Sequence, residues 1–119
     1  MIKGIGIDIV EIKRISCGIE KKILSEKEMK LLNKFKGENR KKEFIAGRFA
    51  VKEALIKSFG TFIPYNKISI LNDAKGKPYL DEKSLDFLKN TFGNYNIHIS
   101  ISHEKNYAVS MVIIEGGER

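Results

Sequence analysis

The chain has 119 residues, of which 42% are hydrophobic, and it carries 22 Lys and Arg residues against 15 Asp and Glu. This length and composition predict one compact domain over residues 1–119 and exclude an intrinsically disordered chain. No uncharged stretch is long enough for a transmembrane helix, and Asp8 interrupts the apolar segment that a signal peptide would need. A single cysteine, Cys17, excludes an internal disulfide and, with only two histidines, a Cys–His zinc site. We therefore expect a cytoplasmic protein without a membrane partner.

The positive charge is concentrated in residues 11–60, which hold 14 Lys and Arg residues against 7 Asp and Glu. Such a basic region favours an acidic or polyanionic partner, although a solvated lysine-rich surface has the same composition. Lysine outnumbers arginine by 18 to 4 in the whole chain. Because arginine makes most of the contacts to base edges, this ratio argues against sequence-specific recognition of nucleic acid.

Residues 2–9 alternate in the manner of a β-strand. One side of this strand is purely aliphatic and is expected to face the core: Ile5, Ile7 and Ile9. The other side has no side chain at Gly4 or Gly6 and then carries Asp8. Glycine weakens a strand, so two glycines on one side indicate that another element or a ligand approaches closely there.

Two helical regions follow. Residues 11–35 predict one or two short helices, and Ser25 with Glu28 forms a capping box at the start of the last. After a polar break, residues 41–59 form the longest helical pattern, which Gly60 closes. Much of its apolar surface comes from Phe44, Ile45, Phe49, Ile56 and Phe59.

The remaining chain combines strand signals with one more helix. Strands are expected over residues 67–71, 97–102 and 107–114, with a turn over 72–78 and a short return strand at Tyr79 and Leu80. A helix capped by Asp81 or Ser84 is expected to end near Phe92. Together the elements predict an α+β fold, a single compact domain with a mostly antiparallel sheet and a long central helix.

Three side chains are candidates for chemistry. Glu53 and Lys57 lie four residues apart, so they share one face of the long helix. Asp8 ends the glycine side of the first strand. If strand and helix meet, Asp8 and Glu53 would form an oxygen site for Mg²⁺, and Lys57 would neutralise phosphate charge. The alternatives are a helix cap at Asp8 and a surface ion pair between Glu53 and Lys57.

Three blocks of sequence occur together, in order, and span nearly the whole chain. The first covers residues 4–14, and the second covers residues 44–60 with Arg-Phe-Ala-Val-Lys-Glu-Ala at its centre. The third joins Gly-Lys-Pro at residues 76–78 with His-Ile-Ser-Ile-Ser-His at residues 98–103. In these blocks the chain resembles the holo-[acyl-carrier-protein] synthases, the short bacterial type of 4′-phosphopantetheinyl transferase.

The resemblance implies transfer of the 4′-phosphopantetheine arm of coenzyme A to a serine of an apo-acyl carrier protein, in fatty acid biosynthesis. Adenosine 3′,5′-bisphosphate would be the other product. The resemblance also implies Mg²⁺ as cofactor and an acidic carrier protein as partner. Members of the family typically form homotrimers with active sites between adjacent subunits, so we expect the same assembly here.

The resemblance also assigns roles to individual residues. Asp8 and Glu53 match metal ligands, and Lys57 matches a lysine beside the reacting phosphate. The serine proton would pass to Glu53 or to a metal-bound water, and Lys57 would stabilise or protonate the departing bisphosphate. Glu53 and Lys57 are therefore the candidate catalytic residues. Positions around coenzyme A are matched by Arg48, Lys57, Gly76, Lys77, Pro78 and His103. Arg14 matches a basic contact for the carrier protein, and nearby lysines would extend that surface: Lys13, Lys21 and Lys22.

A basic, oligomeric module that binds nucleic acid without catalysis is the alternative function. Phe44, Phe49 and Phe59 would then be aromatic platforms for bases, interleaved with lysines. Their helical spacing fits a core face better than a binding surface. We therefore expect a transferase, with no nucleic acid among its partners.

Overall fold

The computed structural model describes residues 1–16 and 18–116, so Cys17 lies outside the described residues. The strands are β1 (Ile2–Glu11), β2 (Ile70–Asn72), β3 (Pro78–Leu80), β4 (Tyr95–His103) and β5 (Tyr107–Gly116). The α-helices are α1 (Glu20–Ile23), α2 (Glu26–Leu32), α3 (Glu38–Phe59) and α4 (Glu82–Phe92). Short 3₁₀ helices are η1 (Ile12–Arg14) and η2 (Tyr65–Lys67).

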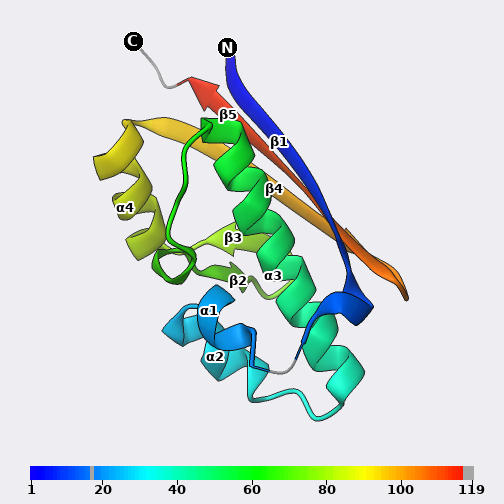
Figure 1. Cartoon of the computed structure of the whole chain (residues 1–119). Coiled ribbons are helices and arrows are strands. Elements are labelled where there is room, and N and C mark those ends of the chain that lie inside the picture. Colours follow the sequence, from blue (N-terminus) through cyan, green and yellow to red (C-terminus); the bar gives the residue numbers. More distant parts are fainter. Residues whose placement is uncertain (17, 117–119) are drawn as a thin grey trace.

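The main sheet has the strand order β1-β5-β4, and both of its pairings are antiparallel. β2 and β3 form a separate antiparallel hairpin. The long helix α3 lies along one side of the main sheet, with α1 and α2 near its first half and α4 beside the other end of the sheet (Figure 1). The predicted α+β fold, with an antiparallel sheet and a long central helix, is confirmed.

The side of β1 that faces the core is the glycine side, which corrects the expectation from the sequence. The isoleucines predicted to face the core are exposed: Ile5 by 60%, Ile7 by 55% and Ile9 by 62%. A Cβ atom on Gly6 would overlap the carbonyl oxygen of Ala54, and one on Gly4 would overlap that of Ser58. The predicted close approach is therefore real, and the approaching element is α3.

Most helix ends follow the predicted signals. Ser25 and Glu28 form the complete capping box of α2, and Gly60 ends α3 in the left-handed region with φ of 73°. Asp81, rather than Ser84, caps α4, because its carboxylate accepts a hydrogen bond from the backbone N–H of Ser84. The strand predicted over residues 67–71 begins later, at Ile70, because Lys67 belongs to η2 and the next two residues lie outside any helix or strand.

The core consists of two apolar clusters, one packed against each half of α3. One joins the first half of α3 to α1, α2 and the end of β1, and the other joins its second half to α4, the hairpin and the main sheet. Small residues of α3 are fully buried at these contacts, notably Ala46, Ala50 and Ala54. No helix within the described part of the chain is long and apolar enough to cross a membrane.

Candidate active site

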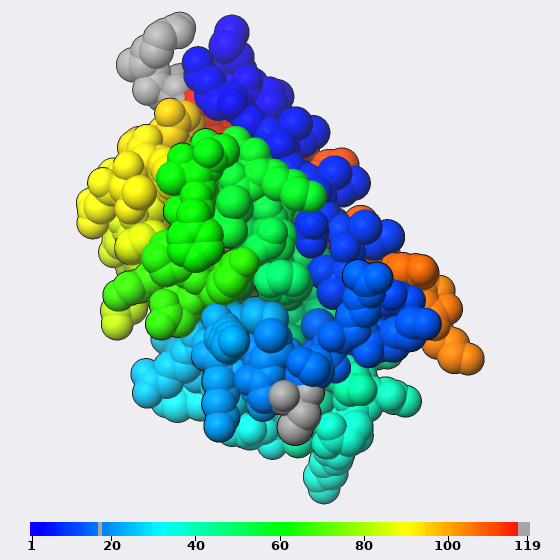
Figure 2. Space-filling model, viewed as in Figure 1, coloured from blue at the N-terminus to red at the C-terminus, as the bar shows by residue number. Residues whose placement is uncertain are grey.

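A groove of about 450 Å³ runs between β1, α1, η2 and α3. Asp8 enters it from β1 and Glu53 from α3, so the structure brings the two candidate metal ligands together. Their meeting depends on the glycine side of β1, since any side chain at Gly6 would hold the strand away from α3. Figure 2 shows the surface where dark-blue β1, blue α1 and green α3 meet.

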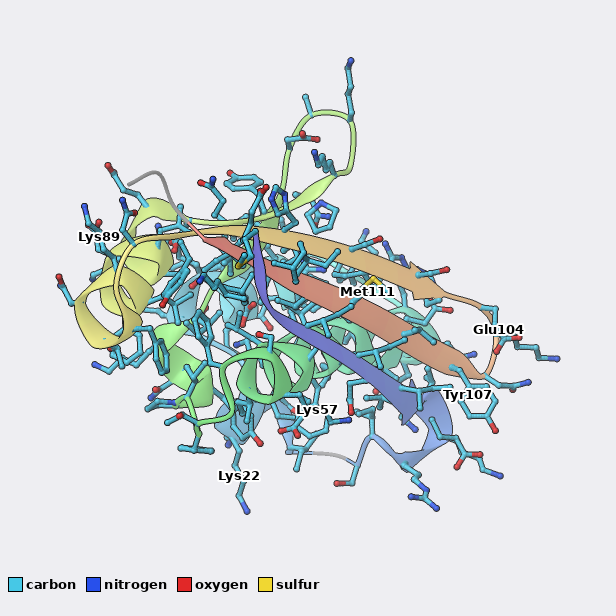
Figure 3. All side chains as sticks on the ribbon, turned by 90° about the horizontal axis from the view of Figure 1, so that it is seen from above. Lys22, Lys57, Lys89, Glu104, Tyr107 and Met111 are labelled. Atoms are coloured by element: carbon cyan, nitrogen blue, oxygen red, sulfur yellow. The ribbon has the colours of Figure 1, made fainter. Side chains whose placement is uncertain are left out.

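Lys57 lies one helical turn beyond Glu53 but makes its contacts with β1. Its Nζ donates to the carbonyl oxygen of Ile7 at 3.0 Å and to Oδ1 of Asp8 at 3.1 Å. The Asp8 side chain is 15% exposed and that of Lys57 is 54% exposed, so the ammonium group remains open to a ligand. Lys57 therefore forms an ion pair with Asp8, the other candidate metal ligand, and not the alternative surface pair with Glu53. Figure 3 shows Lys57 beside β1.

Tyr65 is a member of the groove that the sequence did not indicate. Its hydroxyl donates a hydrogen bond to Oε2 of Glu53. Burial, this hydrogen bond and the negative charges of Glu53 and Asp8 raise the pKa of Tyr65 to about 12. The hydroxyl therefore remains a donor at neutral pH. Tyr65 lies in a segment without periodicity, and its contact depends on the path of the chain after α3.

The two carboxylates suit Mg²⁺. The part of the chain that the structure describes holds no group of three or more His, Cys, Asp or Glu side chains placed to bind a metal. A site of two carboxylates leaves the remaining positions to water and to phosphate oxygens of a substrate, as is usual for Mg²⁺. Asp8 on β1 and Glu53 on α3 supply these two carboxylates.

A second pocket, of about 430 Å³, lies on the β4 side of α3. It collects four of the residues predicted around coenzyme A: Arg48, Gly76, Pro78 and His103. Lys77 does not line this pocket but a neighbouring one, with Pro78 and His98. The second pocket is therefore separate from the groove that holds Asp8 and Glu53.

Arg48 holds one wall of this pocket. Its guanidinium donates two hydrogen bonds to the carbonyl oxygen of Ile70 and a third to Oδ1 of Asn72. Burial lowers the pKa of Arg48 to about 10, so the group stays charged at neutral pH. It also stacks on Phe44, with 4.2 Å between the guanidinium carbon and the ring centroid. Arg48 therefore fixes the hairpin against α3 and gives the pocket a positive wall.

The aromatic residues of α3 do not form a platform for bases. Phe44 is buried, and Phe59 stacks on Phe92 with 4.1 Å between the ring centroids. Phe49 packs edge-on against Tyr65. The interpretation of these rings as a nucleic-acid surface is therefore not supported.

The residues predicted to contact a carrier protein lie around the end of β1 and on α1. Arg14 and Lys22 line the groove that holds Asp8 and Glu53. Lys13 and Arg14 are about equally exposed, and both lie within 4 Å of Glu11. Lys21 is exposed on α1. In Figure 3, Lys22 and Lys57 extend toward the same side of the molecule.

A buried ion pair lies behind the groove and was not predicted. The side chains of Lys52 and Glu28 are 2% and 0% exposed, and their charged atoms are 2.6 Å apart. Nζ of Lys52 also donates to the carbonyl oxygens of Ile23 and Tyr65. Burial lowers the pKa of Lys52, and the charge of Glu28 opposes this change. The pair joins α1, α2, α3 and η2 at one point.

Comparisons with known proteins agree with this geometry. A family model described as the 4′-phosphopantetheinyl transferase superfamily matches residues 4–112. The holo-[acyl-carrier-protein] synthase of Petrotoga mobilis is 54% identical over 115 residues, covering 96% of this chain and 97% of the relative. That of Staphylococcus haemolyticus is 40% identical, covering 97% and 98% of the two chains.

Solved structures give the same result. A crystal structure of the holo-(acyl-carrier-protein) synthase of Bacillus anthracis, in complex with CoA (3′,5′-ADP), matches with a TM-score of 0.82 and 40% identity, covering 98% of this chain and 99% of that one. The synthase of Helicobacter pylori in complex with coenzyme A matches with a TM-score of 0.70 and 30% identity, covering 93% and 99%. With matches of this length and identity, the chain belongs to the 4′-phosphopantetheinyl transferase superfamily.

Proposed function

We propose that this chain is a holo-[acyl-carrier-protein] synthase, which transfers 4′-phosphopantetheine from coenzyme A to a serine of apo-acyl carrier protein and releases adenosine 3′,5′-bisphosphate. The names of its full-length relatives support this activity. The observation that carries it is the groove in which Asp8 and Glu53 meet, with Lys57 bonded to Asp8. Displacement at phosphorus needs charge neutralisation and positioning, which these groups provide, and the nucleophile comes from the carrier protein.

Asp8 and Glu53 would hold the magnesium ion. When bound, Mg²⁺ neutralises the charge of the pyrophosphate of coenzyme A and so favours its cleavage. Lys57 lies against Asp8 with its ammonium group half-exposed, so it would contact the phosphate that leaves with the nucleotide. A fixed positive charge at this point stabilises the negative charge that develops in the transition state.

The nucleotide end of coenzyme A would occupy the pocket lined by Arg48, Gly76, Pro78 and His103. Arg48 provides positive charge, although its own hydrogen bonds hold it to the hairpin. Gly76 has a φ of 88°, which another residue rarely adopts, so the loop keeps its shape only with glycine there. Lys77 follows directly and would reach a phosphate from the rim.

The carrier protein would dock on the basic surface formed by Lys13, Arg14, Lys21 and Lys22. Acyl carrier proteins are acidic, as the family resemblance implies, so the charges are complementary. Arg14 and Lys22 lie at the groove itself, which would bring the carrier serine close to Asp8 and Glu53.

The active enzyme would be a homotrimer with active sites at the subunit interfaces. The carboxylate groove lies at the β1 edge of the main sheet and the nucleotide pocket at the β4 edge, so one chain holds two separate half-sites. The outer side of the sheet also exposes an apolar surface: Ile5, Ile7, Ile9 and Met111. A second copy that covers this surface would bring its nucleotide pocket to the first chain's carboxylates.

Release of adenosine 3′,5′-bisphosphate tests the activity. Chromatography should detect this nucleotide only when the protein, coenzyme A, Mg²⁺ and an apo-acyl carrier protein are all present. Glu53→Gln, which removes one carboxylate and keeps the size of the side chain, should abolish release in a folded protein. Normal release by this variant at saturating Mg²⁺ would contradict the two-carboxylate site.

Complementation tests the shared site. Asp8→Asn disables the carboxylate groove, and His103→Glu places a negative charge in the nucleotide pocket. Each variant alone should be inactive, but random exchange of subunits in an equal mixture should restore about a quarter of all sites, one site in each heterotrimer of a closed ring. An active monomer in sedimentation, or no regain of activity after demonstrated exchange, would refute the shared site.

A further inference from the structure

One carboxylate oxygen of Glu53 already accepts a hydrogen bond from within the protein. The hydroxyl of Tyr65 donates a hydrogen bond to Oε2, so a cation at Oε2 would have to share that oxygen with the hydroxyl, whereas Oε1 is not engaged by this bond. Asp8 is arranged in the same way, because Lys57 donates to its Oδ1. Two carboxylates that each have one oxygen hydrogen-bonded favour contacts through the other oxygen, which suit a small cation that binds single oxygens and keeps several waters.

We propose that Tyr65 is a positioning residue that holds Glu53 as a one-oxygen ligand and thereby makes the site prefer Mg²⁺ to Ca²⁺. The inference rests on the proposed metal site at Asp8 and Glu53. Mg²⁺ requires near-octahedral geometry, whereas Ca²⁺ takes more oxygens and often binds both oxygens of a carboxylate. A hydrogen bond on Oε2 therefore disfavours the two-oxygen contact that Ca²⁺ would use.

The position of Tyr65 is fixed from both ends. Its ring packs edge-on between Phe49 and Phe62, with 5.7 Å between ring centroids in each pair. Its carbonyl oxygen accepts a hydrogen bond from the buried Nζ of Lys52 at 2.8 Å. The same Nζ bonds Glu28 and the carbonyl of Ile23, so its three protons are all used.

This support makes Tyr65 a firm partner for Glu53. Lys52 holds the backbone of Tyr65, and rotation of the side chain away from Glu53 would separate its ring from those of Phe49 and Phe62. Partners that hydrogen-bond a metal ligand typically account for roughly ten- to a hundredfold in metal affinity. Tyr65→Phe removes only the hydroxyl and keeps the ring, so its effect on the metal is separable from its effect on packing.

Metal binding to the purified protein, without coenzyme A or carrier protein, tests the inference. Mn²⁺ serves as the probe, because the spectrum of the free ion in electron paramagnetic resonance reports the bound fraction. Competition with Mg²⁺ and with Ca²⁺ then gives both affinities. Tyr79→Phe, an exposed tyrosine on β3, is the matched control.

In Tyr65→Phe we expect the affinity for Mg²⁺ to fall about tenfold and that for Ca²⁺ to fall less, so that the preference for Mg²⁺ declines. The control should keep the wild-type ratio. An unchanged ratio in Tyr65→Phe would overturn the inference, even if both affinities fall together with the melting temperature, since that result describes a structural role alone.

The same experiment separates failure of the inference from failure of the metal site. If the wild-type protein binds Mn²⁺ and Glu53→Gln does not, the two-carboxylate metal site is supported. The result for Tyr65→Phe then shows whether Tyr65 has the proposed role. If Glu53→Gln binds Mn²⁺ as tightly as the wild-type protein, the two-carboxylate site is wrong and the role of Tyr65 falls with it.

Discussion

Lys57 has two possible roles that a single substitution separates. As a structural residue it would contribute only exposed contacts to Asp8 and Ile7, and its loss would affect stability slightly. As a catalytic residue it stabilises the leaving phosphate, so Lys57→Ala should lower kcat by several orders of magnitude with little change in melting temperature. Steady-state kinetics and thermal unfolding of the variant measure both effects.

A control for this prediction is Lys83→Ala, which removes an exposed lysine from α4. This variant should keep the wild-type kcat. A Lys57→Ala enzyme that loses stability and turns over at the normal rate would show that the lysine only supports Asp8.

The buried pair of Lys52 and Glu28 gives a prediction about how the elements are joined. Lys52→Met keeps an unbranched side chain but leaves the Glu28 carboxylate buried without its partner. Removing one member of a buried pair typically costs about 3–5 kcal/mol. We expect a loss of this size in chemical denaturation, and part of it should return in the double variant Lys52→Met, Glu28→Gln, which has no buried charge at this point. Equal stability of Lys52→Met and wild type would refute the role of the pair.

The contact between β1 and α3 gives a second prediction at the same scale. Gly6→Ala would place a methyl group on the carbonyl oxygen of Ala54, so the strand must move away from the helix. Overpacking of this kind costs about 1–3 kcal/mol, and the move should also separate Asp8 from Glu53 and weaken metal binding. Denaturation and Mn²⁺ titration measure the two effects.

Gly37→Ala is the matched control, because a Cβ atom there meets no atom within 4 Å. It should leave the metal affinity unchanged. Tight metal binding by Gly6→Ala would show that the site does not depend on this close approach.

The charge of the whole molecule predicts how it meets its carrier protein. Attraction between a basic surface and an acidic partner is screened over a Debye length of about 8–10 Å, so the KM for carrier protein should rise with salt more than that for coenzyme A. Arg14→Glu should raise the KM for carrier protein by roughly ten- to a thousandfold and spare coenzyme A binding. Lys89→Glu on α4 makes the same change of charge elsewhere and should have little effect (Figure 3). An equal loss of coenzyme A binding in Arg14→Glu would place Arg14 in the nucleotide site instead.

Local signals in the sequence predicted most elements because they act over a few residues. The capping box at Ser25, the helix end at Gly60 and the cap at Asp81 are examples. The orientation of β1 was predicted wrongly, since alternation defines two sides of a strand but not which one is buried. In the structure the side with Gly4 and Gly6 is buried, because the backbone of α3 packs directly against these glycines. The isoleucines on the other side remain exposed.

Contacts between distant parts of the chain were the hardest to predict. Strand alternation and helical spacing singled out Asp8, Glu53 and Lys57, the resemblance to a known family matched them to roles, and the structure places them together. Tyr65 and the partnership of Lys52 with Glu28 depend on tertiary packing, and neither has a periodic or motif signal. Nothing in the sequence distinguishes the buried Lys52 from the many exposed lysines, so its burial could not be predicted from the sequence.

The mass of the carrier protein is the most direct test of the proposed function. Apo-acyl carrier protein is incubated with the chain, coenzyme A and Mg²⁺ and then measured intact by mass spectrometry. Transfer predicts a gain of about 340 Da, the mass of the phosphopantetheine arm left when the nucleotide departs, and no gain when the chain carries Asp8→Asn. An unchanged mass with folded enzyme and a carrier protein that a known synthase modifies would contradict the proposed function.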